Sequence, residues 1–265
     1  MELYGKRVVI TGASGGIGSA IAGILDQHGC QLLLVGRDSQ RLESLMRSLS
    51  GFGHANLKAD LVSREGVEKL QTMAESFQAD ILINALGVNE LVLFEDMDAA
   101  DIEIQLATNL QAPMEVCQAL LPQLRRSRGT IVNIGSILGS IGYPGSVLYC
   151  ATKFGLRGFS EALRRELADT GITVIYFAPR ATATELNSAS ADAMNRELGN
   201  AVDSPEWVAE QLLISLQGGK STNHYLGWPE TLFVRINALL PSLVDKAIGK
   251  QLAVIKKYCS SEGAA

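Results

Sequence analysis

Histidine and cysteine are sparse in this chain of 265 residues, and neither type is clustered. The three histidines are His28, His54 and His224, and the four cysteines are Cys30, Cys117, Cys150 and Cys259. No two cysteines have the C-x-x-C spacing that is typical of zinc sites and thiol redox motifs. We therefore predict no metal site and no histidine-based catalytic triad. Scattered cysteines favour reduced thiols in a cytoplasmic protein over a disulfide framework.

The chain also lacks a surplus of basic residues and a long apolar run. Lys and Arg number 23 against 28 Asp and Glu, which gives a net charge of −5 at pH 7. Nucleic-acid binding through a broad basic surface is therefore excluded. No segment offers the roughly 18 consecutive apolar residues that a membrane-spanning helix needs. The opening MELYGKRVVITG passes directly from polar residues into a strand-like run, so we predict no signal peptide.

Hydrophobic residues make up 47% of the chain, so a large core can form. Seven short aliphatic runs are typical of strands, at 7–11, 31–35, 56–60, 80–84, 129–136, 172–178 and 224–227. Six stretches have a helical apolar period, at 17–28, 39–49, 63–76, 99–126, 148–169 and 205–217. Because nearly apolar strands alternate with helices, we predict an α/β fold. It is a doubly wound parallel sheet of about seven strands with helices on both faces.

A glycine-rich turn, TGASGGIG (11–18), follows the first predicted strand and precedes the first predicted helix. Its glycines are Gly12, Gly15, Gly16 and Gly18. This arrangement lets backbone N–H groups and a helix N-terminus meet a pyrophosphate. The alternative is an ordinary turn that needs glycine only for its backbone conformation. Its place in the first strand–helix unit favours nucleotide binding.

The segment LLLVGRD (32–38) indicates which dinucleotide binds. A site that prefers NAD usually has an acid here that binds the ribose 2′-hydroxyl. Gly36 stands at that position, and Arg37 offers a forked donor suited to a 2′-phosphate. Asp38 comes one residue too late for the ribose contact. We predict NADP(H) as cofactor; the alternative role for Arg37 is a solvated charge at a helix entry.

The stretch YCATK (149–153) places Tyr149 and Lys153 on one face of a predicted helix. Alone, this spacing is a weak signal. It follows Ser136 at the end of a predicted strand, and the T-G-x-x-x-G-x-G form of the glycine turn lies far upstream. These motifs, in this order, resemble the short-chain dehydrogenase/reductase family over roughly residues 5–228.

The resemblance implies a Rossmann-type fold and a catalytic set of Asn109, Ser136, Tyr149 and Lys153. Asp60 in KADL is similar to the family's adenine-contacting acid, and ILINALG (81–87) matches its N-N-A-G segment imperfectly. The residues implied to bind the cofactor are Gly12, Ser14, Gly15, Gly16, Ile17, Gly18, Arg37, Asp60, Leu61, Asn84, Ala85, Gly87, Tyr149, Lys153, Pro179 and Thr184.

Carbonyl reduction needs a hydride at carbon and a proton at oxygen. A free tyrosine has a pKa near 10, and we expect the neighbouring Lys153 ammonium to lower the pKa of Tyr149. By resemblance, Lys153 also holds the nicotinamide ribose. Ser136 would bind the substrate oxygen as negative charge develops on it, and Asn109 would hold a water that links Lys153 to solvent. The alternatives are a strand-end cap for Ser136 and a helix-bending polar residue for Asn109.

Two positions depart from the family pattern. Ala85 replaces an asparagine that the family uses to steady its central sheet. PRATAT (179–184) puts Arg180 where the family's P-G-x-V-x-T has glycine, while Thr184 keeps the threonine position. Arg180 is expected to begin the loop over the substrate, where it binds an anionic group; the alternative is a solvent-facing arginine.

The substrate pocket is predicted to include Ser136, Leu138, Tyr143 and Arg180. Its walls are expected after the strands at 80–84 and 129–136 and in a lid at 185–200. The expected wall residues are mainly apolar: Leu91, Leu93, Ile137, Leu138, Ile141, Tyr143 and Leu148. This composition favours a hydrophobic carbonyl substrate over a sugar.

Residues 229–265 extend past the family-like part, 1–228, and we predict a helical extension of the same domain. Apolar residues recur there with a helical period that Pro241 interrupts. Between 232 and 257 the basic residues are Arg235, Lys246, Lys250, Lys256 and Lys257, against one acid, Asp245. The stretch 232–257 is therefore expected to pack on its own domain, cover the pocket, mediate dimerisation, or contact an anionic membrane surface.

The sequence thus predicts an NADPH-dependent reductase that converts an apolar ketone or aldehyde to an alcohol. The alternatives are a 3-oxoacyl reductase acting on carrier- or CoA-linked chains, and a non-catalytic NADP-sensing protein. The expected partners are a small-molecule carbonyl or alcohol and further copies of the chain, in a homodimer or homotetramer formed through 99–126 and 148–169. We expect a cytoplasmic location.

Overall fold

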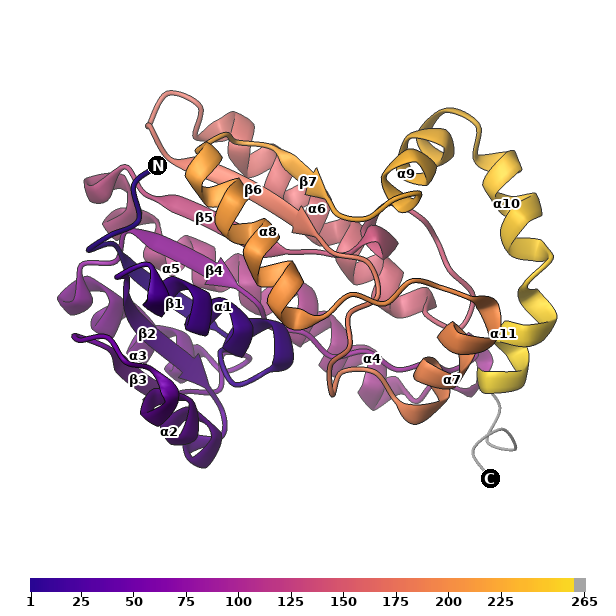
Figure 1. Cartoon of the computed structure of the whole chain (residues 1–265), viewed down its shortest axis with the longest axis horizontal. Helices are drawn as coiled ribbons and strands as arrows, with labels where there is room; N and C mark the ends of the chain where they lie inside the picture. Colours follow the sequence, from indigo (N-terminus) through magenta and orange to yellow (C-terminus); the bar gives the residue numbers. More distant parts are fainter. Residues whose placement is uncertain (260–265) are drawn as a thin grey trace.

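A seven-stranded parallel sheet forms the centre of the protein in this computed structural model, which describes residues 1–259 (Figure 1). The strands are β1 (Arg7–Thr11), β2 (Gln31–Gly36), β3 (Ala55–Lys58), β4 (Ile81–Asn84), β5 (Thr130–Ile134), β6 (Thr173–Ala178) and β7 (Asn223–Tyr225). Their order is β3-β2-β1-β4-β5-β6-β7, and every neighbouring pair is parallel. The predicted α/β fold with a doubly wound sheet is confirmed.

Helices cover both faces of this sheet. One layer consists of α1 (Gly16–Gln27) and α8 (Pro205–Gly218), and the other of α3 (Arg64–Phe77), α5 (Ala112–Ser127) and α6 (Val147–Glu166). The shorter α2 (Ser39–Ser48) lies beside β3, α4 (Ala99–Leu106) precedes α5, and α7 (Ala189–Leu198) lies beyond the carboxyl ends of the strands.

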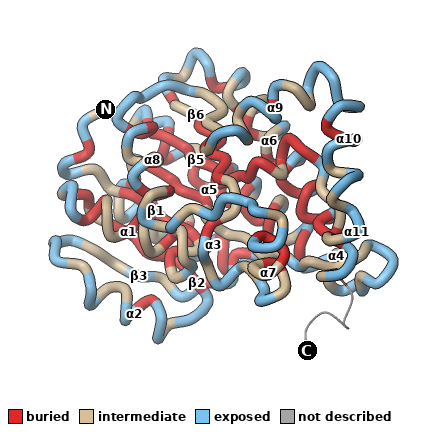
Figure 2. Tube along the Cα trace, turned by 45° about the vertical axis from the view of Figure 1, so that its right-hand side comes forward, coloured by how far each residue is buried: buried red, intermediate tan, exposed pale blue. Residues whose placement is uncertain are grey.

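Alternation along the strands divides the core between the two faces. Val8 and Ile10 of β1 pack in one cluster with Ile21 of α1, whereas Val9 packs in the other with Leu70 of α3. Successive strand residues point to opposite faces, so strands covered on both sides are apolar throughout. The buried residues accordingly concentrate in the sheet and the helix faces against it (Figure 2).

The helix predicted at 99–126 is interrupted. Residues Ala107–Gln111 form a turn of π-helix (η2) between α4 and α5, in which the Ala112 N–H bonds to the Ala107 carbonyl. Pro113 lacks the N–H that would bond to the Asn109 carbonyl in a regular helix. The α-helical pattern therefore cannot run through Asn109, and a wider turn takes its place.

The C-terminal extension forms α9 (Glu230–Leu239), α10 (Pro241–Gly249) and α11 (Leu252–Cys259). Pro241 is the first residue of α10, a position where its missing N–H costs nothing. The extension leaves the body at α9, and α11 returns to pack against α7 (Figure 1). Residues 260–265 of the predicted extension lie outside the described part. Within residues 1–259, no helix is both long and apolar enough to span a bilayer.

Candidate active site

A large cavity of about 1320 Å³ lies at the carboxyl ends of the strands. Its wall includes segments that follow β1, β2, β4, β5 and β6. The strand order reverses between β1 and β4, and such a reversal opens a crevice that binds ligands in open parallel sheets. The extension closes one side of the cavity, mainly through Phe233, Ile236, Val244 and Ile248.

The glycine turn lines the cavity and leads into α1. Gly15 is the N-cap of α1 and no side chain caps this helix, so its first N–H groups are available to an anion. A Cβ on Gly16 would come within 2.6 Å of the Thr184 side chain. The turn therefore offers backbone donors in a narrow space, which fits the pyrophosphate of a nicotinamide dinucleotide.

The turn after β2 lies at the expected adenosine end of the cavity. Arg37 is exposed and lines the cavity, whereas Gly36 is buried against Ser14 and Leu42. The Asp38 carboxylate accepts hydrogen bonds from Gln40 N (2.9 Å) and Arg41 N (3.1 Å) as the N-cap of α2. The acid in this turn is thus engaged in capping a helix.

The other residues predicted to contact the cofactor fall into two groups. Those that line the cavity include Ser14, Ile17, Asp60, Leu61, Ala85, Gly87, Pro179 and Thr184. Asn84 is not among the lining residues: its buried amide donates to Asn133 Oδ1 at 2.9 Å, and Asn133 donates to Ser160 Oγ at 2.9 Å. Asn84 therefore steadies the central sheet, the role that the family gives to the position of Ala85.

Tyr149, Lys153 and Ser136 meet in the cavity wall. Tyr149 and Lys153 lie one turn apart on α6, and the Lys153 ammonium lies 5.6 Å from the Tyr149 ring centroid. Lys153 Nζ also donates to the Ile134 carbonyl at 3.0 Å. Ser136 follows β5, and its Oγ accepts the Leu138 N–H at 3.1 Å. All three residues are buried.

Burial controls the ionisation of this pair. It raises the pKa of Tyr149 to about 12, and a hydrogen bond with the Ser136 side chain offsets only part of the rise. Burial also lowers the pKa of Lys153 to about 8. The expected lowering of the Tyr149 pKa by Lys153 is therefore wrong for this structure, because burial is the largest influence on the Tyr149 hydroxyl.

The side chain of Asn109 holds a neighbouring loop. Its Oδ1 accepts the Val88 N–H at 2.8 Å, and its Nδ2 donates to the Val88 carbonyl at 2.8 Å and to Thr152 Oγ1 at 3.3 Å. Asn109 is fully buried and does not line the cavity. The side-chain amide of Asn109 is thus engaged in fixing the segment after Gly87.

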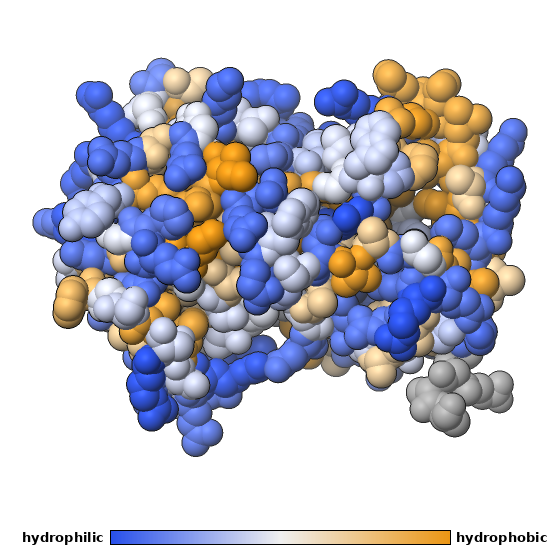
Figure 3. Space-filling model, in the orientation of Figure 1, coloured by the Kyte–Doolittle hydropathy of each residue, from blue (hydrophilic) through white to orange (hydrophobic). Residues whose placement is uncertain are grey.

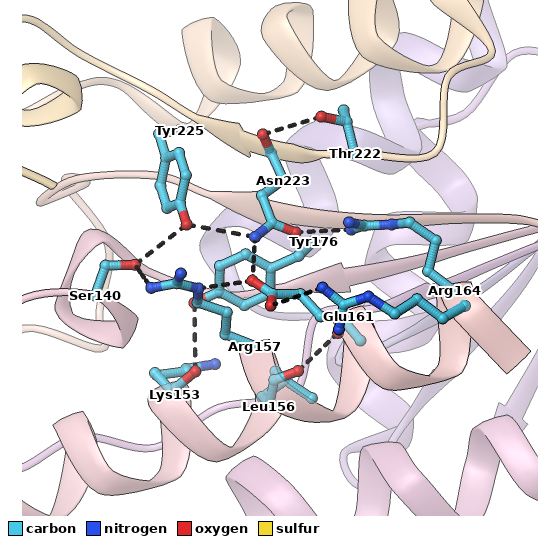
Figure 4. A network of polar contacts seen from close by, with 12 residues as sticks. Ser140, Lys153, Leu156, Arg157, Glu161, Arg164, Tyr176, Thr222, Asn223 and Tyr225 are labelled. Atoms are coloured by element: carbon cyan, nitrogen blue, oxygen red, sulfur yellow. Dashed lines mark hydrogen bonds and ion pairs between the residues drawn. The ribbon is translucent and has the colours of Figure 1, made fainter. Parts of the chain in front are cut away.

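Tyr176 is a structural part of the site that sequence analysis missed. Its buried hydroxyl accepts the Ser136 N–H at 3.2 Å and donates toward the carbonyls of Ser136 (3.1 Å) and Lys153 (3.4 Å). In Figure 4 a dashed line joins this hydroxyl to Lys153, beside the network of Arg157, Glu161 and Asn223. The run ITVIYFA contains no signal for this role, because Tyr176 is typical of any buried strand.

The predicted substrate residues Ser136, Leu138, Tyr143 and Arg180 all line the cavity, together with Leu91, Ile137 and Ile141. Leu93 and Leu148 do not line it: Leu93 packs beside Met194 and Ile255, and Leu148 is buried in α6. The lid expected at 185–200 contains α7, whose Met194 and Asn195 also line the cavity.

Arg180 does not face solvent. Its side chain is 17% exposed and pairs with Asp203 and Glu230. The hydrogen bond with Asp203 is the largest influence on the pKa of this guanidinium and raises it, and the contact with Glu230 raises it further. An anionic substrate or cofactor group would have to compete with two carboxylates of the chain itself.

Comparisons with known proteins agree with this geometry. A family model for short chain dehydrogenase matches residues 6–195. Nodulation protein G of Rhizobium sp. (strain N33) is 37% identical over 220 residues, which cover 78% of this chain and 89% of that protein. Carbonyl reductase family member 4 of Danio rerio is 32% identical over 226 residues, covering 83% of this chain and 95% of that protein. The crystal structure of a dehydrogenase/reductase from Sinorhizobium meliloti 1021 has a TM-score of 0.77 at 27% identity, covering 85% and 95% of the two chains.

The lowered pKa of Lys153 predicts a pH dependence of stability. Between pH 8 and about 10, Lys153 binds a proton in the unfolded chain but not in the folded one, so its contribution to the free energy of unfolding rises with pH. Replacing Lys153→Met removes this contribution. We expect the difference in unfolding free energy, wild type minus variant, to rise on the order of 2 kcal/mol from pH 7.5 to pH 10.

Urea denaturation across this pH range measures that difference. Lys246→Met is the matched control, because Lys246 is exposed on α10. Parallel stability profiles for wild type and Lys153→Met would contradict the assignment of a buried, destabilised ammonium.

Proposed function

The chain belongs to the short-chain dehydrogenase/reductase family of oxidoreductases, and we propose that it uses NADPH to reduce the carbonyl of a mainly apolar ketone or aldehyde. One observation carries this proposal. The same cavity wall contains the glycine turn, the buried set of Ser136, Tyr149 and Lys153, and an apolar region formed partly by the extension. Such a cavity accommodates a dinucleotide and an apolar substrate side by side.

The preference for the phosphorylated cofactor rests on the turn after β2. Any side chain at position 36 would crowd Ser14 and Leu42, and Asp38 is engaged at the N-terminus of α2. Arg37 and Lys58 supply positive charge at the cavity wall. A 2′-phosphate would therefore meet cations and no free carboxylate in this turn.

NADPH, when bound, supplies the hydride that adds to the carbonyl carbon. The glycine turn and the N-terminus of α1 would hold its pyrophosphate, and Lys153 its nicotinamide ribose. Tyr149, with a pKa of about 12, keeps its proton at neutral pH and donates it to the substrate oxygen. The Ser136 hydroxyl stabilises the negative charge that develops on that oxygen.

Two alternatives are weaker. A 3-oxoacyl reductase acting on carrier- or CoA-linked chains would use Arg180 and the basic extension to bind phosphate, but Arg180 is already paired with Asp203 and Glu230. A non-catalytic NADP-sensing protein would not need the set of Ser136, Tyr149 and Lys153. These residues therefore favour an enzyme.

We also propose a homodimer or homotetramer through α4, α5 and α6, which expose Ile104, Met114 and Phe154.

Peripheral membrane contact through 232–257 is a separate proposal. Leu239 and Leu240 at the turn between α9 and α10 are 80% and 55% exposed, and apolar side chains gather over these helices (Figure 3). A cytoplasmic location is supported by the four cysteines, which are buried and unpaired.

Replacement of Tyr149→Phe tests the proposed reaction. The variant lacks the proton donor but keeps the ring, so we expect kcat to fall by about 10²- to 10⁴-fold while NADPH affinity changes little. A screen of aliphatic and aromatic aldehydes and ketones, followed by the loss of NADPH absorbance, measures turnover. Tyr4→Phe, at an exposed tyrosine, is the control.

Substantial turnover by Tyr149→Phe would refute the mechanism. Tight NADPH binding by the wild-type protein without turnover of any substrate would instead favour the sensor.

Replacement of Arg37→Ala tests the cofactor preference. Loss of a charge-assisted hydrogen bond should lower the ratio of kcat/KM for NADPH to that for NADH by roughly 10- to 100-fold. Arg47→Ala on α2, the helix that follows this turn, is the control, because Arg47 is exposed and does not line the cavity. Equal use of NADH and NADPH by the wild type, or an unchanged ratio in Arg37→Ala, would contradict this proposal.

The two surface proposals can be separated by sedimentation. We expect Phe154→Glu to lower the mass of the protein in equilibrium sedimentation, because it places a charge in the proposed oligomer contact. We expect Leu239→Ser combined with Leu240→Ser to leave the mass unchanged and to reduce pelleting with phosphatidylserine vesicles. A wild-type monomer would dispose of the first proposal, and a wild type that stays in the supernatant would dispose of the second.

A further inference from the structure

Arg180 makes an unusually complete set of contacts for an arginine beside a cavity. Its Nε and Nη2 donate to the two carboxylate oxygens of Asp203, at 2.9 and 2.8 Å. Its Nη1 donates to Glu230 Oε2 at 3.1 Å and to the Trp228 carbonyl at 3.2 Å. The forked, rigid guanidinium is suited to such a bidentate pair with a third contact, which lysine cannot reproduce.

The two carboxylates belong to different parts of the molecule. Asp203 is fixed to the loop that begins at Arg180: its N–H donates to the Ala181 carbonyl at 2.9 Å, and its carbonyl accepts the Ala183 N–H at 2.9 Å. Glu230, in contrast, is the first residue of α9 and belongs to the extension. Asp203 therefore orients the guanidinium, and Nη1 is the part that reaches the extension.

The loop 179–187 also reaches the cofactor side of the cavity. The Pro179 carbonyl accepts the Ile137 N–H at 3.0 Å, next to Ser136, and Thr184 lies against Gly16 of the glycine turn. On the other side, α9 contributes Phe233 and Ile236 to the apolar wall. Arg180 thus lies where the cofactor loop and the apolar wall meet.

The segment that leads into α9 passes close to Arg180. A Cβ on Gly227 would lie 2.8 Å from Arg180 Cδ and 2.9 Å from Glu230 Oε2. Asp203 is 10% exposed and Glu230 is 24% exposed at the side chain, so solvent screens these pairs less than ion pairs on the surface.

We propose that Arg180 is a positioning residue that fastens the C-terminal extension to the cofactor loop, so that the loop and the apolar wall order together when NADPH binds. This role rests on the proposed reductase function, since it concerns the same cavity. Under this proposal the extension contributes to substrate specificity, because its apolar wall becomes fully ordered only when the loop 179–187 binds the cofactor.

Hydrogen–deuterium exchange with and without NADPH tests the coupling. In the wild type, NADPH should slow exchange in the peptides covering 179–187 and in those covering α9. Glu230→Gln keeps the size of the side chain but removes its charge. In this variant we expect NADPH to slow exchange in 179–187 as before, and the protection of α9 to fall by about three- to tenfold.

Arg180→Gly gives the second variant, with the residue that the family has at this position. It should also lose the protection of α9, and adding Glu230→Gln to it should cause no further change. Glu197→Gln is the matched control, because it removes the exposed pair with Lys257 between α7 and α11. If Arg180→Gly does not fold, the comparison of Glu230→Gln with Glu197→Gln still decides the question.

Retained protection of α9 in Glu230→Gln, or additive effects of the two substitutions, would overturn the proposal. Exchange without NADPH separates this failure from failure of the proposed function. A wild type that does not bind NADPH would refute the reductase. In that case, exchange of α9 that is about three- to tenfold faster in Glu230→Gln than in Glu197→Gln would still show that the contact between Arg180 and Glu230 holds the extension. Equal exchange rates in the two variants would refute this role.

Discussion

One buried hydroxyl, that of Tyr176 on β6, joins the parts of the candidate active site. It bonds to the backbone of Ser136 after β5 and approaches the Lys153 carbonyl on α6, so three elements are held in one place. The surrounding chain is adapted to it: a Cβ on Gly135 or on Gly139 would overlap this side chain. Through this hydroxyl, strand β6 holds the backbone of Ser136 close to the backbone of Lys153.

Burial is also the largest influence on the pKa values of Tyr149 and Lys153, the two ionisable groups of this site. Tyr149 and Lys153 are buried in the cavity wall, and their pKa values move in opposite directions, to about 12 and about 8. A phenol of this kind does not ionise in the resting enzyme. It can still protonate an alkoxide, which is a far stronger base than a phenolate. In the proposed reaction the proton therefore leaves Tyr149 only as the substrate oxygen becomes basic.

The sequence is sufficient to predict the fold because the signals for it are local. Apolar runs and helical periods each span a few residues, and they identify the sheet and most of the helices. The same holds for the glycine turn and for Tyr149 and Lys153, whose spacing on one helix brings them together. The interruption at Asn109 is harder, because it depends on Pro113 and on a bond to Val88 in another segment. The role of Tyr176 depends wholly on contacts 40 and 23 residues away.

Arg180 depends both on a local sequence signal and on contacts with residues far along the chain. The resemblance to the family identifies it as a departure, since glycine is expected there, but its partners lie 23 and 50 residues further along the chain. The family model ends at residue 195, so both carboxylates belong to the part of the chain beyond it. Asp203 binds Nε and Nη2 of the guanidinium, and the remaining nitrogen, Nη1, donates to Trp228 and Glu230 in the segment that follows β7. Arg180, within the part that the family model matches, and Glu230, at the start of the extension, therefore form a direct contact between these two parts of the chain.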